Sequence, residues 1–487
     1  MTSAKTLSAL AVLLALAGCA APMASPQPVP EIPTQWQAPL PHQGSLTDLS
    51  QWWQQQGDPL LVALIESAQQ QSPTVATAAS RIAQARASRT TAGAALLPTL
   101  DANLSASREP VQTVIAPGSP PPDIVATTIT GGLQAAWEID LFGANRASRD
   151  AAQARLDGAQ AQWHDARVSV AAEVANLYSS LRSCERLLQI SQADAASRGE
   201  TARLAELAAQ AGFQAPAAAA LARASAAEGR GRATQQRALC DIDIKGLVAL
   251  SGWQEPDLRS KLPVAGADIQ DFAPVSVASV PAQALGQRPD IFNAEREVAA
   301  ASADLGSAQA QRYPRLTLRG SIGALRYRAA GMTFDTDTWA IGPLALSLPL
   351  FDGGRSAANV ASAEARYVEA AALYRSKVRQ AVREVEEALV NLQSTAQRSD
   401  DAKVASEGYR ASFKGTEARY QSGLASLVEL EDARRTALAA DTALASLQRE
   451  RRAAWVALYR AMGGGWNATD TALNNATPTA AASSRNP

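Results

Sequence analysis

The sequence predicts an α+β membrane protein that is internally duplicated, each copy holding a strand hairpin and a pair of very long helices. Three observations predict this fold class: a repeat of about 210 residues, strands that alternate between apolar and polar side chains, and proline-free segments far longer than globular helices. A repeat of this length is the size of a domain. We expect the copies to cover residues 58–253 and 288–466, joined by a linker over 254–287.

The N-terminus has the pattern of an export signal. Residues 1–18 contain Lys5 and an apolar run that ends in Leu16-Ala-Gly before Cys19, which is typical of a secretory signal peptide. A cysteine at this point resembles the bacterial lipobox, which implies cleavage before Cys19 and covalent acylation of that residue. Residues 19–57 then form the lipidated N-terminus and a proline-rich linker, of which 22–43 are expected to be extended and unpacked. An ordinary signal peptide with a chance cysteine is the alternative.

Composition narrows the possible functions. The chain has 45 Lys and Arg against 46 Asp and Glu, so no basic surface for nucleic acid is expected. Its two histidines, His42 and His164, cannot assemble a histidine triad or a His-based metal site, and no phosphate-binding loop is present. We therefore expect neither an enzyme nor a metal protein.

Four segments alternate in the manner of strands that have one apolar and one polar face. They form two expected hairpins, at about 98–141 and 314–350, with loops at 108–126 and 326–337. Each strand is about ten residues long, which suffices to cross a bilayer when tilted. A soluble sheet packed on helices would also alternate, but two matched hairpins favour the outer-membrane barrel pattern. The segments begin at Leu100, Leu133, Leu316 and Leu344.

Four strands cannot close a barrel in lipid, because unpaired backbone groups at open edges are costly there. The barrel must therefore be shared between chains. Two copies give about 8 strands and a filled interior, whereas three give about 12 and leave room for a lumen. The polar face of the strands favours a trimer.

Long helices follow each hairpin. The segments 144–210 and 356–421 lack proline and are rich in good helix formers. About 65 residues make a helix about 100 Å long, which spans a compartment rather than filling a core. Shorter helices are expected to pack antiparallel to them or to precede the strands; these are 216–250, 426–462, 58–96 and 288–312.

Cys184 and Cys240 lie at equal distances along the chain from Gly212, the expected turn between two antiparallel helices. They would thus lie at matching heights in an exported protein, where disulfides persist. We expect a disulfide, with a pair of buried free thiols as the alternative.

Several short motifs resemble those of one known family. They are Trp137–Gly143, Arg288–Ile291, Tyr313–Leu316, Phe351–Gly354 and Arg419–Gly423. Together with their order, they resemble the outer-membrane factor family of TolC-like channel-tunnels. The lipobox is similar to that of the NodT-like lipoprotein branch of efflux outer-membrane subunits.

The resemblance implies a homotrimer with a 12-stranded β-barrel in the outer membrane and a periplasmic α-helical barrel of coiled coils. It implies a periplasmic adaptor and an inner-membrane pump, commonly of the resistance-nodulation-division class, as partners in multidrug efflux. Transport is passive, with no cofactor besides the lipid on Cys19, such as palmitate. A type I protein-secretion duct and a non-channel structural lipoprotein are the alternatives. The tail, 467–487, is expected to be disordered.

The resemblance also implies a periplasmic gate and adaptor contacts. Asp432 matches the family's gate aspartate, Val428 its apolar ring, and Arg435 a polar latch. Val428 is smaller than the leucine usual at this position. The tips of the two helical hairpins match the adaptor-contact turns; their residues are Gly212, Phe213, Gln214, Gly423, Leu424 and Ala425.

Overall fold

The computed structural model describes residues 32–40, 51–110, 124–262, 272, 274–275, 277 and 281–466. Cys19, the signal segment, most of the expected linker and the tail lie outside these residues. The chain divides into two compact units. The first is built from residues 82–159 and 294–374, and the second from 30–81, 160–293 and 375 onward.

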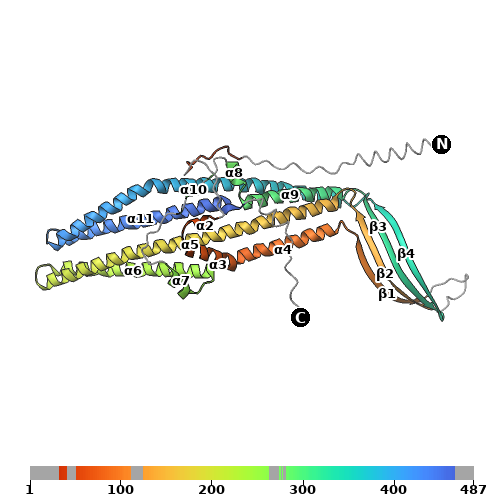
Figure 1. Cartoon of the computed structure of the whole chain (residues 1–487), viewed down its shortest axis with the longest axis horizontal. Helices are drawn as coiled ribbons and strands as arrows, with labels where there is room; N and C mark the ends of the chain where they lie inside the picture. Colours follow the sequence, from red (N-terminus) through yellow and green to blue (C-terminus); the bar gives the residue numbers. More distant parts are fainter. Residues whose placement is uncertain are drawn as a thin grey trace. The chain divides into compact units, whose positions relative to one another are not determined.

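The strands of the first unit form one antiparallel sheet in chain order (Figure 1). They are β1 (Thr99–Pro110), β2 (Val125–Ile139), β3 (Arg315–Ala329) and β4 (Met332–Ser347). The two hairpins pair through β2 and β3, with Leu133 opposite Ile322. In this sheet β1 and β4 each pair along one edge only.

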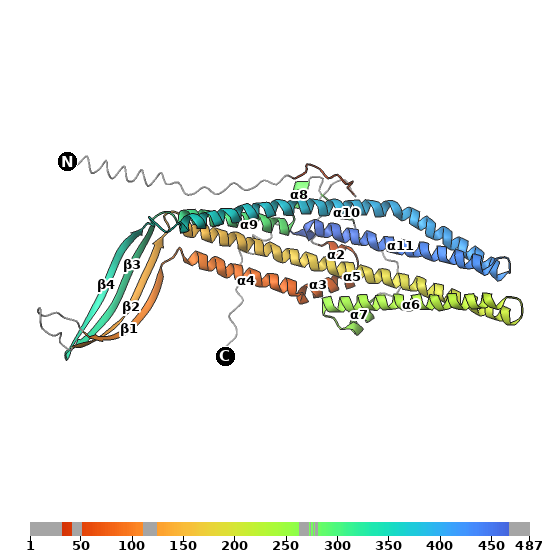
Figure 2. The ribbon, with the colours of Figure 1, turned by 180° about the vertical axis from the view of Figure 1, so that it is seen from behind.

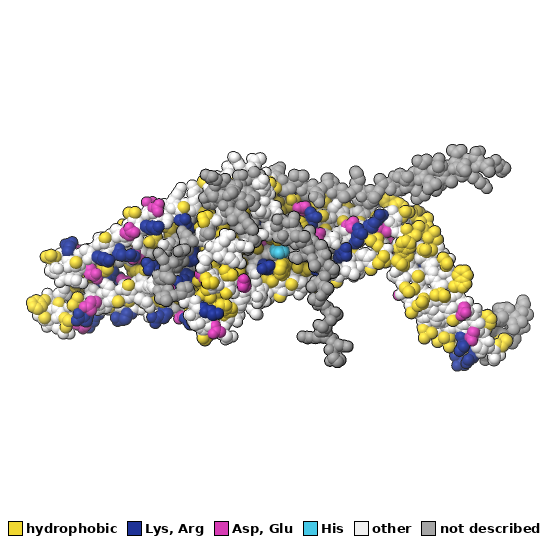
Figure 3. All heavy atoms as spheres, in the orientation of Figure 1, with side chains coloured by type: hydrophobic (Ala, Val, Ile, Leu, Met, Phe, Trp, Pro, Cys, Tyr) yellow, Lys and Arg dark blue, Asp and Glu magenta, His cyan; other side chains and the backbone are white. Residues whose placement is uncertain are grey.

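One face of the sheet is apolar and exposed. Cross-strand neighbours in a ladder share a face, and the register places Ala102, Leu133, Ile322 and Trp339 on the same one. Trp339 is 76% exposed. Figure 3 shows hydrophobic side chains covering the strands and charged side chains near the β3–β4 turn. Exposed apolar side chains in a contiguous band indicate a surface that contacts lipid or protein rather than water. Further members of the band are Leu100, Leu104, Ile341, Leu344 and Leu346.

The other face carries mostly polar side chains. Asn103, Ser105 and Thr130 lie on it, with a hydrogen bond between the hydroxyls of Ser105 and Thr130 at 2.6 Å. The register therefore confirms the predicted alternation for the segments that begin at Leu100, Leu133, Leu316 and Leu344.

The predicted loop at 326–337 is wrong. β3 continues to Ala329 and β4 begins at Met332, so only Ala330 and Gly331 turn the chain. Both have positive φ, 48° and 79°, as a tight hairpin turn requires. The strands are accordingly 15 and 16 residues long, more than the ten that we expected.

Two facing glycines lie at the centre of the sheet. Gly132 is opposite Gly323 across β2 and β3. A Cβ on Gly132 would lie 2.5 Å from the carbonyl oxygen of Ile322, and one on Gly323 would lie 2.6 Å from that of Gly131. The strands can approach so closely only because neither residue has a side chain.

The helices of the chain include two of 67 residues each, α5 and α10. Each long helix is followed by a turn and a shorter helix that runs back alongside it. The second unit therefore contains two antiparallel helical hairpins, α5–α6 and α10–α11 (Figure 2). The helices in chain order are α2 (Trp52–Gln55), α3 (Pro59–Gln71), α4 (Pro73–Ala94), α5 (Ala144–Gln210), α6 (Pro216–Ser251), α7 (Glu255–Lys261), α8 (Pro281–Leu285), α9 (Pro289–Ala310), α10 (Arg355–Gln421), α11 (Leu427–Ala461) and the short η1 (Gly463–Gly465).

An aspartate begins each long helix in the first unit. The Asp140 carboxylate accepts hydrogen bonds from the backbone N–H groups of Asn145 and Arg146, at 3.1 and 2.9 Å. The Asp352 carboxylate does the same for Ser356 at 2.9 Å. Carboxylates stabilise helix N-termini by satisfying free N–H groups. The hairpin predicted at about 98–141 therefore ends at Ile139, and Asp140 caps α5 instead of continuing the strand.

The core of the second unit is aromatic. The ring of Trp52, fully buried, stacks on Tyr459 at 5.0 Å, and Trp53 meets Tyr459 edge-on at 4.8 Å. Trp36 is also buried in this cluster. Part of the stretch expected to be an unpacked linker therefore packs as core, and the remainder lies outside the described residues.

Two glutamates of α10 hold segments that are distant in sequence. Glu386 accepts hydrogen bonds from the backbone N–H groups of Gln37 and Ala38, at 2.6 and 2.8 Å. Glu384 accepts one from Arg288 at 2.7 Å. Both carboxylates therefore have structural partners rather than facing only solvent.

Cys184 on α5 and Cys240 on α6 form a disulfide, with a Cα–Cα distance of 5.4 Å. Both residues are buried. The bond links the two arms of the first helical hairpin.

None of the helices in the described part of the chain is long and apolar enough to cross a membrane.

Candidate functional site

The candidate gate lies at the ends of the two helical hairpins, where each turns. Gly212 and Gly423 end the long helices with φ of 78° and 74°. The N–H of Phe213 donates to the carbonyl of Ala208 at 2.8 Å, and that of Leu424 to the carbonyl of Arg419 at 2.7 Å. These bonds satisfy carbonyls that a helix end leaves free, and glycine adopts the required left-handed conformation at little cost.

Large apolar side chains are exposed at both turns. Phe213 is 86% exposed and Leu424 is 70% exposed. Such side chains add no stability to the isolated chain, and their exposure suits a surface that a partner covers. Gln214 and Ala425 complete the predicted tip residues.

A capping box orients α11 after the second turn. The Ser426 hydroxyl accepts from the N–H of Glu429 at 3.2 Å, while the Glu429 carboxylate accepts from the N–H of Ser426 at 2.7 Å. This arrangement satisfies two N–H groups and fixes where the helix begins. Hydrogen bonds from Ser426 lower the pKa of the exposed Glu429 carboxyl.

The three predicted gate residues share one face of α11. Val428, Asp432 and Arg435 are spaced four and three residues apart, so their side chains lie in one row. Val428 is 68% exposed. Asp432 and Arg435 form an ion pair, and their side chains remain 63% and 77% exposed. The row is thus presented outward from the chain.

The opposite face of α11 packs on the first hairpin. Leu427 and Leu430 are buried against Ala202 and Ala205 of α5 and Ala222 of α6. Alanines allow the three helices to approach closely. The position of the exposed row is therefore fixed by packing behind it.

A buried polar network reinforces this contact. The Glu431 carboxylate accepts from the Arg198 guanidinium of α5 at 2.6 Å and from the Ser225 hydroxyl of α6 at 2.9 Å. Asp194 holds the other side of Arg198 at 2.9 Å. Three helices of both hairpins thus meet at one carboxylate.

Arg434 makes the second half of the network. It pairs with Glu431 and donates to the hydroxyls of Ser197 and Thr201 on α5, at 3.1 and 2.9 Å. Its side chain is 3% exposed. Burial lowers the pKa of the Arg434 guanidinium, and the charge of Glu431 opposes that effect.

The sequence reading missed this network. It did not identify Glu431, Arg198 or Arg434 as partners. The one available signal was the spacing of Glu431 and Arg434, three residues apart on a face that otherwise holds leucines and alanines. Gly229 of α6 also contributes, because a Cβ there would lie 2.9 Å from the Arg198 side chain.

In the described residues, no group of His, Cys, Asp or Glu has the arrangement of a metal site. The described part of the chain has a sheet with an exposed apolar face, two long helical hairpins and an exposed row of predicted gate residues. These features define a channel subunit that completes its walls with further copies.

Comparison of this chain with known proteins shows the family to which it belongs. The family model described as "Outer membrane efflux protein" matches residues 64–252 and 280–464. The chain belongs to this family, which consists of channel-type proteins of the outer membrane, and the fold class predicted from the sequence is confirmed.

Three relatives illustrate the similarity. The pyoverdine export outer membrane protein OpmQ of Pseudomonas putida is 30% identical, covering 96% of this chain and 99% of OpmQ. Nodulation protein T of Rhizobium leguminosarum bv. trifolii is 29% identical, covering 85% and 88%. The crystal structure of the outer membrane protein VceC of Vibrio cholerae has a TM-score of 0.76 and 31% identity, covering 87% of this chain and 100% of VceC.

Proposed function

We propose that the chain forms the exit duct of a tripartite efflux system, which passively conducts small molecules from an inner-membrane pump and a periplasmic adaptor to the exterior. Relatives named for export and efflux span nearly the full length of the chain. The exposed row on α11 carries the gate proposal, since it presents a carboxylate outward from a helix that is packed on its other side.

In a trimer the three copies of Asp432 would meet at one axis. Carboxylates that converge repel one another and attract cations, so a ring of them makes the aperture selective for cations. Val428, one turn earlier, would narrow the same passage, and Arg435 holds the Asp432 carboxylate in its own chain. The gate therefore depends on both charge and size.

The hairpin tips and the N-terminus indicate which partners the duct would have. The exposed Phe213 and Leu424 at the hairpin tips would contact the periplasmic adaptor. A pump of the resistance-nodulation-division class would supply the energy, so the duct needs no catalytic centre. Acylation of Cys19 would anchor the N-terminus in the outer membrane, as the lipobox pattern predicts.

The test is single-channel conductance of purified trimers in planar bilayers. We expect wild-type openings to be small and cation-preferring, and Asp432→Ala to enlarge them and reduce the preference. Asp401→Ala, at an exposed position on α10, is the matched control and should leave both unchanged. A mutant identical to wild type would refute the gate assignment, and folded trimers that never conduct would refute the duct.

A further inference from the structure

One end of the sheet carries charged side chains on the face that is apolar elsewhere (Figure 3). β2 leads into α5 and β4 leads into α10, so the β3–β4 turn lies at the end of the sheet away from the starts of these helices. The chain is an outer-membrane protein with a helical extension into the periplasm. The charged end of the sheet therefore lies at the outer leaflet of that membrane.

The register aligns two arginines on one rung of the ladder. Arg108 of β1 is opposite Thr127 of β2, and Thr127 is in turn opposite Arg328 of β3. Thr127 is two residues from Ile129, so the rung is on the same face as the apolar band. Two strand spacings separate the arginines, which places their Cα atoms about 10 Å apart. Both side chains are exposed, so both guanidinium groups can reach a group that lies over Thr127.

Neither of these arginines is neutralised by a carboxylate of its own chain. Within the described ranges, Arg108 and Arg328 form no salt bridge. Arg326, two residues from Arg328 on the same face, differs because it pairs with Asp335 at 2.8 Å. The rung therefore presents two positive charges to its surroundings.

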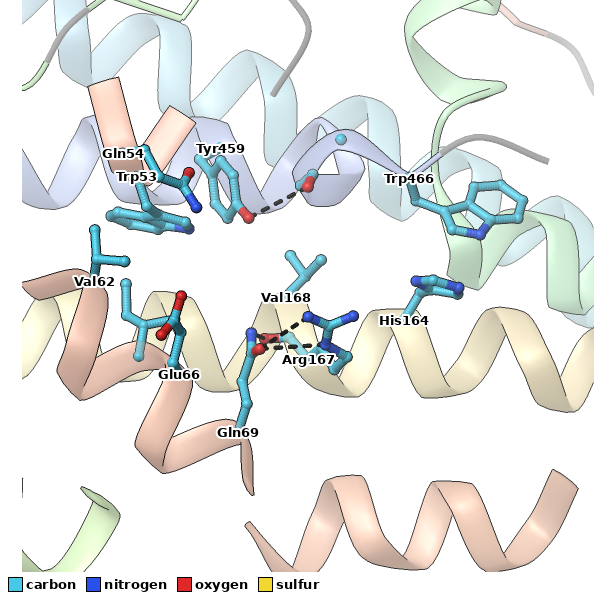
Figure 4. A pocket seen from close by; sticks show the side chains of 13 residues that line it. Trp53, Gln54, Val62, Glu66, Gln69, His164, Arg167, Val168, Tyr459 and Trp466 are labelled. Carbon is cyan, nitrogen blue, oxygen red and sulfur yellow. Dashed lines mark hydrogen bonds between the residues drawn. The ribbon is translucent and has the colours of Figure 1, made fainter. Parts of the chain in front are cut away.

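An arginine inside the second unit shows what a paired guanidinium looks like. Arg167 lines a cavity of 250 Å³. It donates through Nε and Nη2 to the Gln69 side-chain oxygen, both at 3.2 Å (Figure 4). Those contacts use the donors of Arg167 within the chain. The donors of Arg108 and Arg328 have no such use in the described structure, so they are available to a molecule outside the chain.

The rung lies at the level where the hydrocarbon of the bilayer ends. On the apolar face, β2 carries only apolar side chains and glycine from Ile139 to Ile129. About ten residues rise about 34 Å along a strand, and a tilt of about 40° reduces this height to about 26 Å. The apolar band of an outer-membrane barrel is about 25 Å tall. Thr127 is the next residue on this face, so it and the two arginines lie among the lipid headgroups.

A hollow of 460 Å³ lies beside the charged rung. Ile129, Gly131 and Ala324 line it, and all three are on the apolar face. Gly131 and Ala324 are opposite each other, and their small size leaves room between larger side chains. A hollow with apolar walls next to positive charge suits a molecule that has an apolar part and an anionic head.

We propose that Arg108, Thr127 and Arg328 bind a phosphate group of a phosphorylated glycolipid in the outer leaflet, with the acyl chains of that lipid on the apolar band. Guanidinium groups bind phosphate through paired N–H donors, and the Thr127 hydroxyl adds a donor between them. Basic side chains at this level also attract negatively charged headgroups. The site concerns the outer wall of the barrel, so it does not depend on the gate or on what passes through the lumen.

The experiment is native mass spectrometry of detergent-solubilised full-length trimers titrated with diphosphoryl lipid A or with phosphatidylcholine. EDTA is present, so that no divalent cation bridges carboxylates to phosphates. We expect wild type to bind lipid A more tightly, because the phosphate of phosphatidylcholine is neutralised by its own ammonium group. Arg108→Gln and Arg328→Gln should each weaken lipid A binding about fivefold, the factor for one basic side chain at an anionic lipid surface. Neither variant should change the binding of phosphatidylcholine.

Arg319→Gln is the matched control. Arg319 is also an exposed arginine of β3, but it is on the polar face, opposite Ala136, so the variant should bind lipid A as wild type does. Asp337→Asn should give a result of opposite sign. Asp337 lines the hollow, and loss of its negative charge should tighten lipid A binding.

Three results would overturn the proposal. The first is wild-type affinity for lipid A in a variant that combines Arg108→Gln with Arg328→Gln. The second is weaker binding in Arg319→Gln than in that double variant, which would place the phosphate on the polar face. The third is equal affinity of wild type for lipid A and phosphatidylcholine, which would show that acyl chains alone hold lipid on the band. All substituted side chains are exposed, and the same spectra report whether each variant is still a trimer.

Discussion

Single charged residues tie segments of this chain that lie far apart in sequence. Arg288, just before α9, donates to Asp290 through two nitrogens at 3.0 and 2.9 Å, to Glu384 on α10, and to the carbonyl of Ala461 at the end of α11 at 2.9 Å. The Arg288–Ile291 motif noted in the sequence therefore has a structural reason: one guanidinium joins three helices.

Asp290 should make the stability of the second unit depend on pH. Desolvation acts to raise the pKa of Asp290, but the hydrogen bonds and charge of Arg288 outweigh it and lower the pKa. The stabilisation is therefore present above the ordinary carboxyl pKa of about 4 and is lost as pH falls through the lower folded value. Asp290→Asn should reduce stability at pH 7 by about 2 kcal/mol and flatten the acid dependence.

Thermal unfolding of the solubilised protein at a series of pH values between neutral and strongly acidic would measure this effect. The control is Asp150→Asn, whose carboxylate is exposed on α5. Equal acid dependence in Asp290→Asn and wild type would contradict the assignment.

Glu431 should matter more to stability than its neighbour Asp432. Glu431→Ala leaves the buried Arg198 and Arg434 without their shared carboxylate, and breaking a buried ion pair costs about 3 kcal/mol or more. Asp432→Ala, at an exposed ion pair, should cost less than about 1 kcal/mol. Urea unfolding followed by circular dichroism would compare them, and equal midpoints would show that the network does not hold the hairpins together.

At the scale of single residues, the sequence predicted the structural roles of some side chains but not of others. Gly212 and Gly423 were identifiable because a glycine after a long helical segment signals a left-handed turn. The roles of Glu384 and Glu386 were not identifiable, because a glutamate on a helix is usually exposed to solvent and its partner element was not known from the sequence. Their partners, Arg288 and the backbone at Gln37, are distant in sequence.

Among the elements, the long helices were predictable almost to the residue and the fourth strand was not. Uninterrupted good helix formers give a signal over tens of residues. In β4, Asp335 and Asp337 lie on the same face as the apolar band, and Asp335 pairs there with Arg326 of β3 at 2.8 Å. This cross-strand pair breaks the alternation close to the turn, which made a strand look like a loop.

The disulfide should stabilise the α5–α6 hairpin. It closes a loop with a sequence separation of 56 residues, for which restriction of the unfolded chain predicts about 4 kcal/mol. Cys184→Ser with Cys240→Ser should lower the unfolding midpoint relative to the oxidised wild type. Reduced wild type is the matched comparison, and oxidised and reduced protein that unfold at the same temperature would show that the bond adds no stability.

For the whole molecule, the duplication and the alternation predicted both the fold class and the need for several copies. What could not be predicted was the buried polar network and the aromatic core around Trp52. Both depend on which helices meet, and helices with similar alanine-rich surfaces can pack in several ways.

The lipid anchor is testable on the whole protein. Cys19→Ser should abolish acylation of residue 19, yet the protein should remain in the outer-membrane fraction because the apolar band of the sheet holds it there. Mass spectrometry with membrane fractionation would measure both. An unmodified wild-type Cys19 would contradict the lipobox reading, and a released variant would show that the anchor is essential.

The open edges of β1 and β4 also have a genetic consequence. Each seam of the barrel joins two different copies, so a chain with a damaged edge spoils every assembly that it enters. A cell that makes intact and damaged chains in equal amounts builds only about one trimer in eight entirely from intact chains. Edge mutations should therefore be dominant, whereas mutations that prevent a chain from folding at all should be recessive.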